Sequence, residues 1–177
     1  MTAKLPCICT DRLHLRPIEI EDANQLFQYR SQRAHHPYQG WIPERPEEAI
    51  QYIQKRPAQF DQEDSWFQLA MELKGQAGLI GDLGIHFINN KVGHCELGIS
   101  LAVEFRGKGY TTEALTAVMD HLDRDFKKKL ITVAIDPRNQ PSLKLFERLG
   151  FVKSTNYNRV HPIHPEFPND IILGRTL

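Results

Sequence analysis

The sequence has no excess of charge of either sign. Its 177 residues include 22 Lys and Arg against 22 Asp and Glu, so the formal net charge is zero. A protein that binds nucleic acid or an anionic membrane usually carries a clear basic excess, because its partner is a dense array of negative charge. We therefore expect no nucleic-acid partner and no membrane partner, and any contact with RNA would be local.

Cysteine is scarce as well. The three cysteines, Cys7, Cys9 and Cys95, are too few, and odd in number, for the disulfide framework of a small secreted protein. The start of the sequence lacks the apolar segment of a signal peptide, and no apolar run approaches the length of a membrane span. These features predict a soluble cytoplasmic protein.

Spacings typical of a metal site are also missing. Cys7 and Cys9 form a C-x-C pair, but no second pair accompanies them, and a structural zinc site needs four ligands. Two pairs of histidines are close together in expected loops, but neither has the i, i+4 helical spacing of zinc enzymes. These pairs are His35 with His36 and His161 with His164. We predict no metal ion.

The pattern of apolar residues predicts one α/β domain over residues 1–177. Segments of alternating polarity predict strands, and apolar residues three and four apart predict helices. The expected strands lie within 11–18, 65–73, 79–88, 92–103, 127–136, 150–160 and 169–177, and the second to fourth of them form an antiparallel meander. The four expected helices follow Ile20, Pro46, the glycines at 107 and 109, and Pro141.

A glycine-rich stretch, EFRGKGYTTEAL, joins the meander to the third helix. Gly107 and Gly109 allow positive φ and let phosphate oxygens approach backbone N–H groups at a helix start, while Arg106 and Lys108 add charge. The spacing matches neither a Walker loop nor a dinucleotide-binding fingerprint. Taken alone, the stretch is either an anion-binding loop or a helix start that needs flexible residues and exposed charge.

Three segments in the right order resemble the GNAT superfamily of acyl-CoA-dependent N-acetyltransferases, and its RimJ/RimL-like branch in particular. They are LHLRPIEIEDANQLF, HCELGISLAVEFRGKGYTTEAL and DPRNQPSLKLFERLGF. The phosphate-loop pattern of the family, Q/R-x-x-G-x-G/A, maps onto residues 106–111. Thr111 stands where the pattern has Gly or Ala, but its backbone N–H is still available and its hydroxyl can donate to phosphate.

The resemblance implies the GNAT fold, a mixed and mostly antiparallel sheet of six to seven strands flanked by four helices. The fourth and fifth strands splay apart, and the pantetheine arm of acetyl-CoA inserts between them and bonds to the backbone like an added strand. The implied contacts with this co-substrate are Ile99, Leu101, Val103, Arg106, Gly107, Lys108, Gly109, Tyr110, Thr111, Asn139 and Ser142.

Direct attack by an amine on acetyl-CoA requires a base for the amine and a proton for the leaving thiolate. By resemblance, the base is an acid on the strand beside the splay, and Glu96 holds that place. Strand alternation puts Glu96 on one face with His94. A glutamate that merely faces solvent is the alternative reading of Glu96, and Glu166 and Asp170 are alternative bases.

The expected proton donor is a serine. Many members of the superfamily use a tyrosine on the helix after the fifth strand, but the matching residue is Phe146, which has no proton to give. The RimL-like branch is thought to use a serine at the start of this helix, where Ser142 stands. Asn139 matches the asparagine that bonds the cofactor arm. Helix capping by Asn139 and a solvated position for Ser142 are the alternatives.

The amine acceptor stays open at this stage. The branch suggests a protein N-terminal amine, while polyamines and aminoglycosides are other possibilities. The residues expected to line the acceptor pocket are Tyr38, Trp41, His94 and Phe167. A non-catalytic acyl-CoA sensor is the rival hypothesis, because Phe146 and Thr111 depart from the family pattern. The sequence allows either a monomer or a homodimer.

Overall fold

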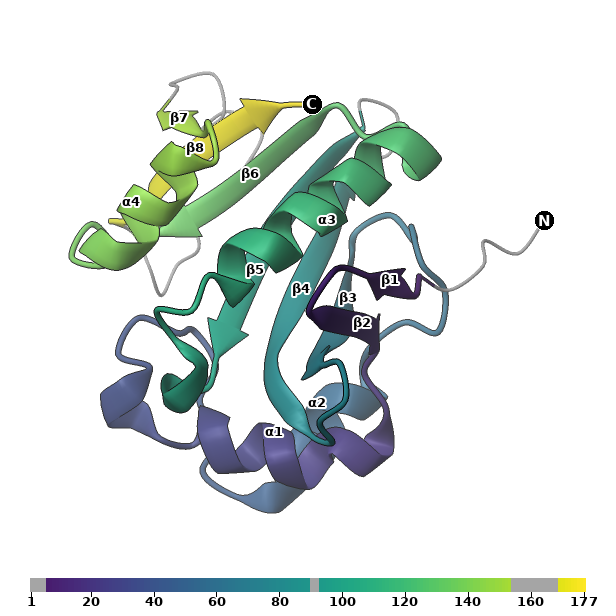
Figure 1. Ribbon diagram of the computed structural model, residues 1–177, viewed down its shortest axis with the longest axis vertical. Coiled ribbons are helices and arrows are strands. Elements are labelled where there is room, and N and C mark those ends of the chain that lie inside the picture. Colours follow the sequence, from purple (N-terminus) through teal and green to yellow (C-terminus); the bar gives the residue numbers. More distant parts are fainter. Residues whose placement is uncertain (1–5, 90–92, 154–168) are drawn as a thin grey trace.

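The chain folds around a central sheet that carries helices on both sides (Figure 1). The computed structural model describes residues 6–89, 93–153 and 169–177. Its strands are β1 (Ile8–Cys9), β2 (Leu13–Pro17), β3 (Ser65–Leu73), β4 (Leu79–Asn89), β5 (His94–Leu101), β6 (Leu130–Ile135), β7 (Val152–Lys153) and β8 (Ile171–Thr176). Its α-helices are α1 (Ala23–Arg30), α2 (Pro46–Gln54), α3 (Tyr110–Phe126) and α4 (Gln140–Arg148), and its 3-10 helices are η1 (Ile20–Asp22), η2 (Arg33–His35) and η3 (Val103–Phe105).

The eight strands follow the order β1-β2-β3-β4-β5-β6-β8-β7. All neighbours pair antiparallel except β5 and β6, which are parallel. The predicted class, a mixed and mostly antiparallel sheet with four α-helices, is confirmed. The described part of the chain has one strand more than expected, because the two-residue strand β1 is too short to show an alternating pattern.

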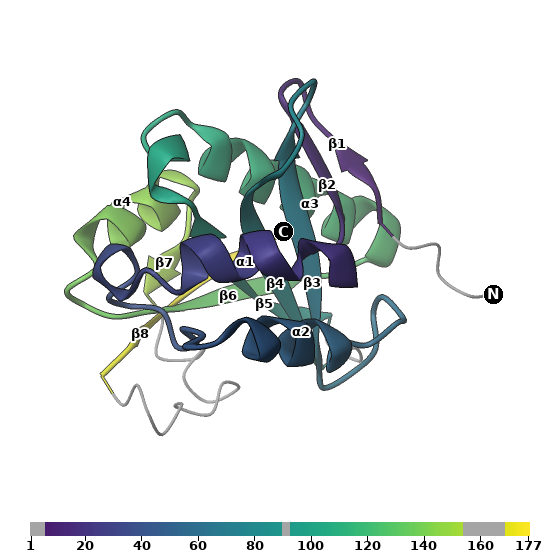
Figure 2. The ribbon, with the colours of Figure 1, turned by 90° about the horizontal axis from the view of Figure 1, so that it is seen from below.

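Two apolar layers flank the sheet. On one face, Leu115, Met119 and Leu122 of α3 are at most 2% exposed and pack against alternate residues of the central strands. On the other face, Leu26 of α1 and Ala49 of α2 belong to a second cluster. Figure 2 shows α3 and α2 on opposite sides of the sheet. The apolar stripe predicted for the third helix is therefore buried, as expected.

The parallel pair of β5 and β6 is short. Pairing covers only His94–Glu96 on β5 and Leu130–Thr132 on β6. Beyond this point the two strands diverge, as Figure 1 shows, although both continue for several residues. The fold therefore contains the splay that the resemblance implies, and it opens directly after Glu96.

The end of β5 differs from its expected boundary. The strand ends at Leu101, not at Val103, because the chain turns into η3. The backbone N–H of Ala102 still donates to the carbonyl of Ile80 on β4 at 2.9 Å. None of the described helices is long and apolar enough to cross a membrane.

Candidate active site

Backbone groups of β5 line the gap between β5 and β6. Ala102 directs its N–H toward β4, whereas the carbonyl of Cys95 accepts from the Thr132 hydroxyl of β6 at 3.5 Å. Successive residues of a strand point their N–H and C=O groups to opposite neighbours. Residues 97, 99 and 101 therefore present theirs toward the gap, where a ligand can pair with them as an added strand would.

Two side chains already approach this edge of β5. Gln39 directs its Nε2 to the carbonyl of Ile99 at 3.4 Å, and Arg106 donates from Nε to the carbonyl of Leu101 at 3.0 Å. The Oε1 of Gln39 in turn accepts from Nη1 of Arg30 at 3.2 Å. Strand alternation points the carbonyls of Ile99 and Leu101 into the gap between β5 and β6, and both contacts agree with this direction.

The 106–111 loop opens onto a cavity of about 850 Å³, called here the loop cavity. Gly107 and Gly109 have φ values of +74° and +82°, the left-handed conformation that the sequence analysis allows for them. Gly109 is the N-cap of α3, and helix geometry leaves the first N–H groups of that helix, Thr111 among them, without an intrahelical acceptor. Both glycines and Thr111 line the cavity.

The charge of the loop cavity is positive. The described residues that line it include no Asp or Glu, and its three arginines are Arg106, Arg138 and Arg148. Arg106 also approaches both ring nitrogens of His36, at 3.3 and 3.4 Å from Nη2. Burial, followed by the charges of Arg106 and Arg30, lowers the pKa of His36 to about 4. Arg138 is also paired with Asp136 at 2.6 Å. The cavity can therefore hold an anion mainly through backbone N–H groups of the loop, with Arg106 and Arg148 at its wall.

Three residues that were predicted to bind the cofactor do not line the loop cavity. Val103 lies in η3 and is 42% exposed, Lys108 extends over the ring of Phe105 at 5.5 Å, and the ring of Tyr110 lies 4.6 Å from the guanidinium of Arg12. Their side chains are thus directed away from the anion site, and only their backbone shapes the loop.

The loop is tied to the N-terminal hairpin of β1 and β2. Arg12 donates from Nη1 to the carbonyl of Lys108 at 3.0 Å, and from Nε to Oε2 of Glu113 in α3 at 2.6 Å. The backbone N–H of Arg12 reaches the other Glu113 oxygen at 2.9 Å. Burial alone would raise the pKa of Glu113, but hydrogen bonds from Thr10 and Arg12 outweigh it and lower that pKa.

A second cavity of about 780 Å³, called here the sheet cavity, lies over the face of β3, β4 and β5 that α1 and α2 also cover. Glu96 and Ser142, the predicted base and acid, both line it. Ile99, Asn139 and Ser142 line both cavities, so the two meet at the gap between β5 and β6.

Glu96 is only 8% exposed. Its Oε2 lies 3.5 Å from Nδ1 of His86, which is directly opposite on β4, and His86 stacks on Trp66 of β3 with ring centroids 4.8 Å apart. His86 and Trp66 line the sheet cavity but were not among the predicted site residues. Alternation along β3 and β4 separates the two faces of each strand, but only the pairing of the strands puts His86 and Trp66 on the face of Glu96.

The start of α4 carries the predicted acid. Asn139 is the N-cap of the helix, and its Oδ1 accepts from the backbone N–H of Ser142 at 3.3 Å, so the capping alternative for Asn139 is part of the structure. Ser142 is half-buried and not merely solvated. Phe146 is 3% exposed and packs edge-on against Phe151, which gives a structural reason for an apolar residue there.

The aromatic wall of the sheet cavity comes from the helical side. Trp41 stacks on Tyr52 of α2 at 4.0 Å between centroids, and Tyr38 lies near the gap, where it lines both cavities. Asp170 lines the sheet cavity as well. Tyr38 and Trp41 therefore line the same cavity as Glu96, and their role in holding an acceptor stays a prediction.

Another residue predicted for the acceptor pocket does not line the sheet cavity. His94 is fully buried and lies 2.9 Å from the Thr132 hydroxyl, at the end where β5 and β6 still pair, and it lines neither cavity. Sharing a strand face with Glu96 is therefore not enough to reach the site. Glu166, Phe167, His161 and His164 lie outside the described residues.

A buried ionic network supports the sheet cavity. Asp82 of β4 is fully buried and accepts from Nε and Nη2 of Arg30 at 3.0 and 2.6 Å. Tyr29 and Gln68 also donate to this carboxylate, and Gln68 accepts from the hydroxyl of Tyr52 at 2.9 Å. Burial would lower the pKa of Arg30, but the charge of Asp82 outweighs it and raises that pKa.

Comparisons with known proteins agree with the geometry. The family model of the acetyltransferase (GNAT) domain matches residues 12–152. The chain is 30% identical over 148 residues to an uncharacterized N-acetyltransferase, p20, of Bacillus licheniformis, covering 81% of each chain. It is 29% identical over 153 residues to the [ribosomal protein uS5]-alanine N-acetyltransferase of Escherichia coli, covering 82% of this chain and 78% of the relative.

A solved structure has the same fold. The microcin C7 self-immunity acetyltransferase MccE, in complex with acetyl-CoA and AMP, superposes with a TM-score of 0.73 at 16% identity, over 95% of this chain and 94% of that one. The predicted resemblance is therefore confirmed. The chain belongs to the GNAT acetyltransferase family and is an acyltransferase of the N-acetyltransferase type, in a family whose co-substrate is acetyl-CoA.

Proposed function

We propose that this chain acetylates a protein N-terminal amine by direct attack on acetyl-CoA, with Glu96 as a base acting through water and Ser142 as the acid. One observation carries the proposal: the loop cavity and the sheet cavity meet at Ser142, and Glu96 lines only the latter. A thioester held in the gap would have an anion site behind it and a carboxylate on the side from which the amine enters.

The roles follow from the bonds that change. The amine nitrogen forms a bond to the thioester carbonyl carbon, the C–S bond breaks, and the CoA thiolate leaves. Glu96 takes the proton that the attacking amine loses, through water. Ser142 gives a proton to the thiolate while its oxygen takes one from water, and the proton on Glu96 then returns to solvent, so that both residues are restored. A thiol has a pKa near 8.5, so the thiolate is a fair leaving group at pH 7, and the acid has the smaller role.

The same arrangement suits the co-substrate. The backbone of Ile99 and Leu101 would pair with the amides of the pantetheine arm, and Asn139 stands beside the path of that arm. The pyrophosphate would lie against Gly107, Gly109 and Thr111, among the three arginines of the loop cavity. Gln39 would exchange its contact with Ile99 for one with solvent or ligand.

The choice of an N-terminal amine rests on its acidity and on a relative. An α-amino group with a pKa near 7.7–8.0 is neutral in roughly a tenth or more of molecules at pH 7, whereas a lysine amine near 10.4 is neutral in about one in several thousand. A base that works through water therefore suffices for the α-amine. One relative is an alanine N-acetyltransferase of ribosomal protein uS5. A cytoplasmic location belongs to the same proposal, because cytoplasmic ribosomal proteins would be the substrates.

Thiol release from acetyl-CoA tests the proposal, with peptides that have a free N-terminal alanine or serine as acceptors. Glu96→Gln should lower kcat/KM by about 10²–10⁴-fold and leave acetyl-CoA affinity unchanged, because only the proton transfer is lost. Ser142→Ala should lower kcat by a smaller factor. Glu147→Gln, on the exposed side of α4, is the matched control and should keep full activity.

Two results would count against the proposal in different ways. Turnover with polyamines or aminoglycosides and none with peptides would overturn the acceptor. Glu96→Gln with wild-type kcat/KM would overturn the base and move the role to Asp170, which lines the same cavity.

A further inference from the structure

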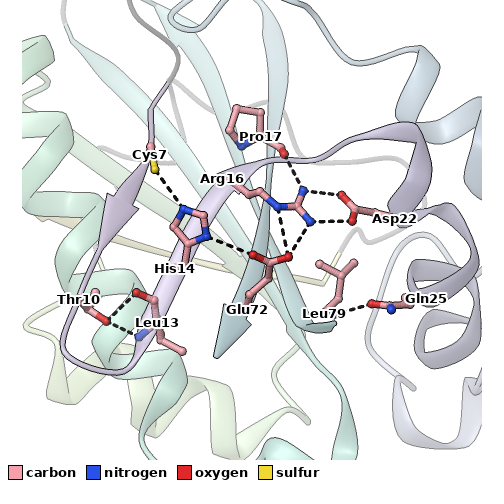
Figure 3. Close-up of polar contacts among 10 residues, drawn as sticks. All are labelled: Cys7, Thr10, Leu13, His14, Arg16, Pro17, Asp22, Gln25, Glu72 and Leu79. Carbon is pink, nitrogen blue, oxygen red and sulfur yellow. Dashed lines mark hydrogen bonds and ion pairs between the residues drawn. The ribbon is translucent and has the colours of Figure 1, made fainter. Parts of the chain in front are cut away.

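Two cysteines and a histidine converge on the N-terminal hairpin, outside both cavities. Cys9 of β1 lies directly opposite His14 of β2, and Cys7 is two residues before Cys9, on the same face of the strand. The Sγ of Cys7 is 3.1 Å from Nε2 of His14 (Figure 3). One ligand atom from each of the three residues lies within 4.8 Å of the other two.

These separations are close to those of a tetrahedral metal site. Zinc binds sulfur at about 2.3 Å and imidazole nitrogen at about 2.0–2.1 Å, so its tetrahedral ligand atoms are roughly 3.5–3.8 Å apart. The exposed Cys7 and Cys9 side chains need only small rotations to reach this geometry. Leu13 and Leu15, on the opposite face of β2, are fully buried and fix the hairpin to the core.

A carboxylate holds the histidine ring in the orientation that a metal needs. Glu72 lies opposite His14 on β3, and its Oε2 is 3.1 Å from Nδ1 of His14. The other oxygen of Glu72 accepts from Nη2 of Arg16 at 2.7 Å, and Arg16 is anchored in turn by Asp22 (Figure 3). Metal-bound histidines usually donate their second N–H to such a carboxylate, which fixes the tautomer and points the free nitrogen at the ion.

We propose that Cys7, Cys9 and His14 bind a thiophilic divalent ion, Zn²⁺, with a solvent molecule as the fourth ligand. Two thiolates and a neutral imidazole are a soft donor set that selects zinc over magnesium or calcium. Binding releases the two thiol protons and gives a site without net charge, because the two thiolates balance the ion. With solvent as the fourth ligand, the site is not a closed structural zinc site, but the bound ion would also link the two-residue strand β1 to β2.

Along the chain, no second pair of ligands accompanies Cys7 and Cys9. Strand pairing supplies the third protein ligand instead, in the pattern C-x-C-x₄-H. Because the site is separate from the two cavities, its existence does not depend on the proposed acetylation mechanism.

Zinc and cobalt titrations of the reduced, untagged protein test the site. One Zn²⁺ should bind per chain and protect two thiols from a thiol reagent, and Co²⁺ should give a sulfur-to-metal charge-transfer band. Cys9→Ser and His14→Gln should each abolish tight binding. Cys95→Ala, in the core on the other face of the sheet, is the matched control and should keep the stoichiometry. Glu72→Gln should weaken zinc affinity by about 10- to 100-fold and keep the cobalt spectrum.

The far-UV circular dichroism spectrum and cooperative unfolding should survive in each variant, which would show that the variants fold. Zinc should raise the thermal midpoint of the wild type and not that of Cys9→Ser. Undiminished zinc binding by Cys9→Ser and His14→Gln would overturn the proposal, as would a reduced wild-type protein that takes up no zinc at micromolar concentration.

Discussion

The loop cavity and the sheet cavity are built in different ways. The loop cavity takes its key donors from the backbone of one continuous segment, in which Gly107 and Gly109 have positive φ and α3 begins. The sheet cavity is built from residues on α1, α2, α4 and five strands, supported by the buried Asp82. A site made of local backbone tolerates side-chain changes around it, whereas a site made of distant side chains depends on the packing that joins them.

The largest effect on stability should come from the ionic support of the sheet cavity. Arg30→Met leaves the fully buried Asp82 without its cation, which should lower the free energy of unfolding by about 3–5 kcal/mol. Denaturant titration measures this change. Arg33→Met, at an exposed position of η2, should cost almost nothing. Adding Asp82→Asn to Arg30→Met should recover part of the loss, and a double variant as unstable as the single one would contradict this account.

A smaller, pH-dependent effect should come from His36, beside the loop cavity. Its pKa is about 4 in the folded protein and near 6.5 in the unfolded chain, so the unfolded chain binds the proton more readily between these values. The free energy of unfolding should therefore fall as the pH drops from 6.5 to 4, by at most about 2 kcal/mol once solvent screening is included.

The variant His36→Asn should flatten this part of the stability curve, measured by denaturant titration at several pH values. His35→Asn, at the exposed neighbouring position, should change it only slightly, because the charge of His35 is the smallest of the contributions that lower the pKa of His36. An equal slope in the wild type and His36→Asn would show that another group titrates.

The smallest effect on stability, and a specific one on binding, should come from the glycines. Gly107→Ala and Gly75→Ala both place a Cβ at positive φ with nothing within 4 Å, so each should cost about 1–2 kcal/mol of strain. Only Gly107 lines the loop cavity, so only its variant should also weaken acetyl-CoA binding. Calorimetry on the two variants separates strain from lost contact, and equal affinities would show that the loop cavity does not hold the cofactor.

The two cavities also differ in how far the sequence predicts them. The glycine conformations and the helix start could be inferred, because both are set by neighbours along the chain. The face of Glu96 followed from strand alternation in the same way. His86, directly opposite Glu96, was missed because finding it requires the register of β4 and β5, which alternation along a single strand does not give.

The errors have the same origin. His94 shares the face of Glu96 but lies where the strands still pair, and only the point of divergence of β5 and β6 separates the two positions. The pairing of Cys9 with His14 was not predicted either, because β1 is too short to be recognised from its residues. Long strands and local turns can be inferred from one sequence, whereas contacts across strands require their pairing.

The bonds of Arg12 join positions that are 96 and 101 residues apart in the chain. The shape of the 106–111 loop thus depends on an edge hairpin, not only on its own glycines. Local unfolding of β1 and of the turn at Arg12 would release the loop while Leu13 and Leu15 keep β2 in the core under α3. Acetyl-CoA bound at the loop would then protect the backbone amides of β1 from hydrogen exchange without touching that strand. Conversely, substitutions in the hairpin would change the affinity for the co-substrate.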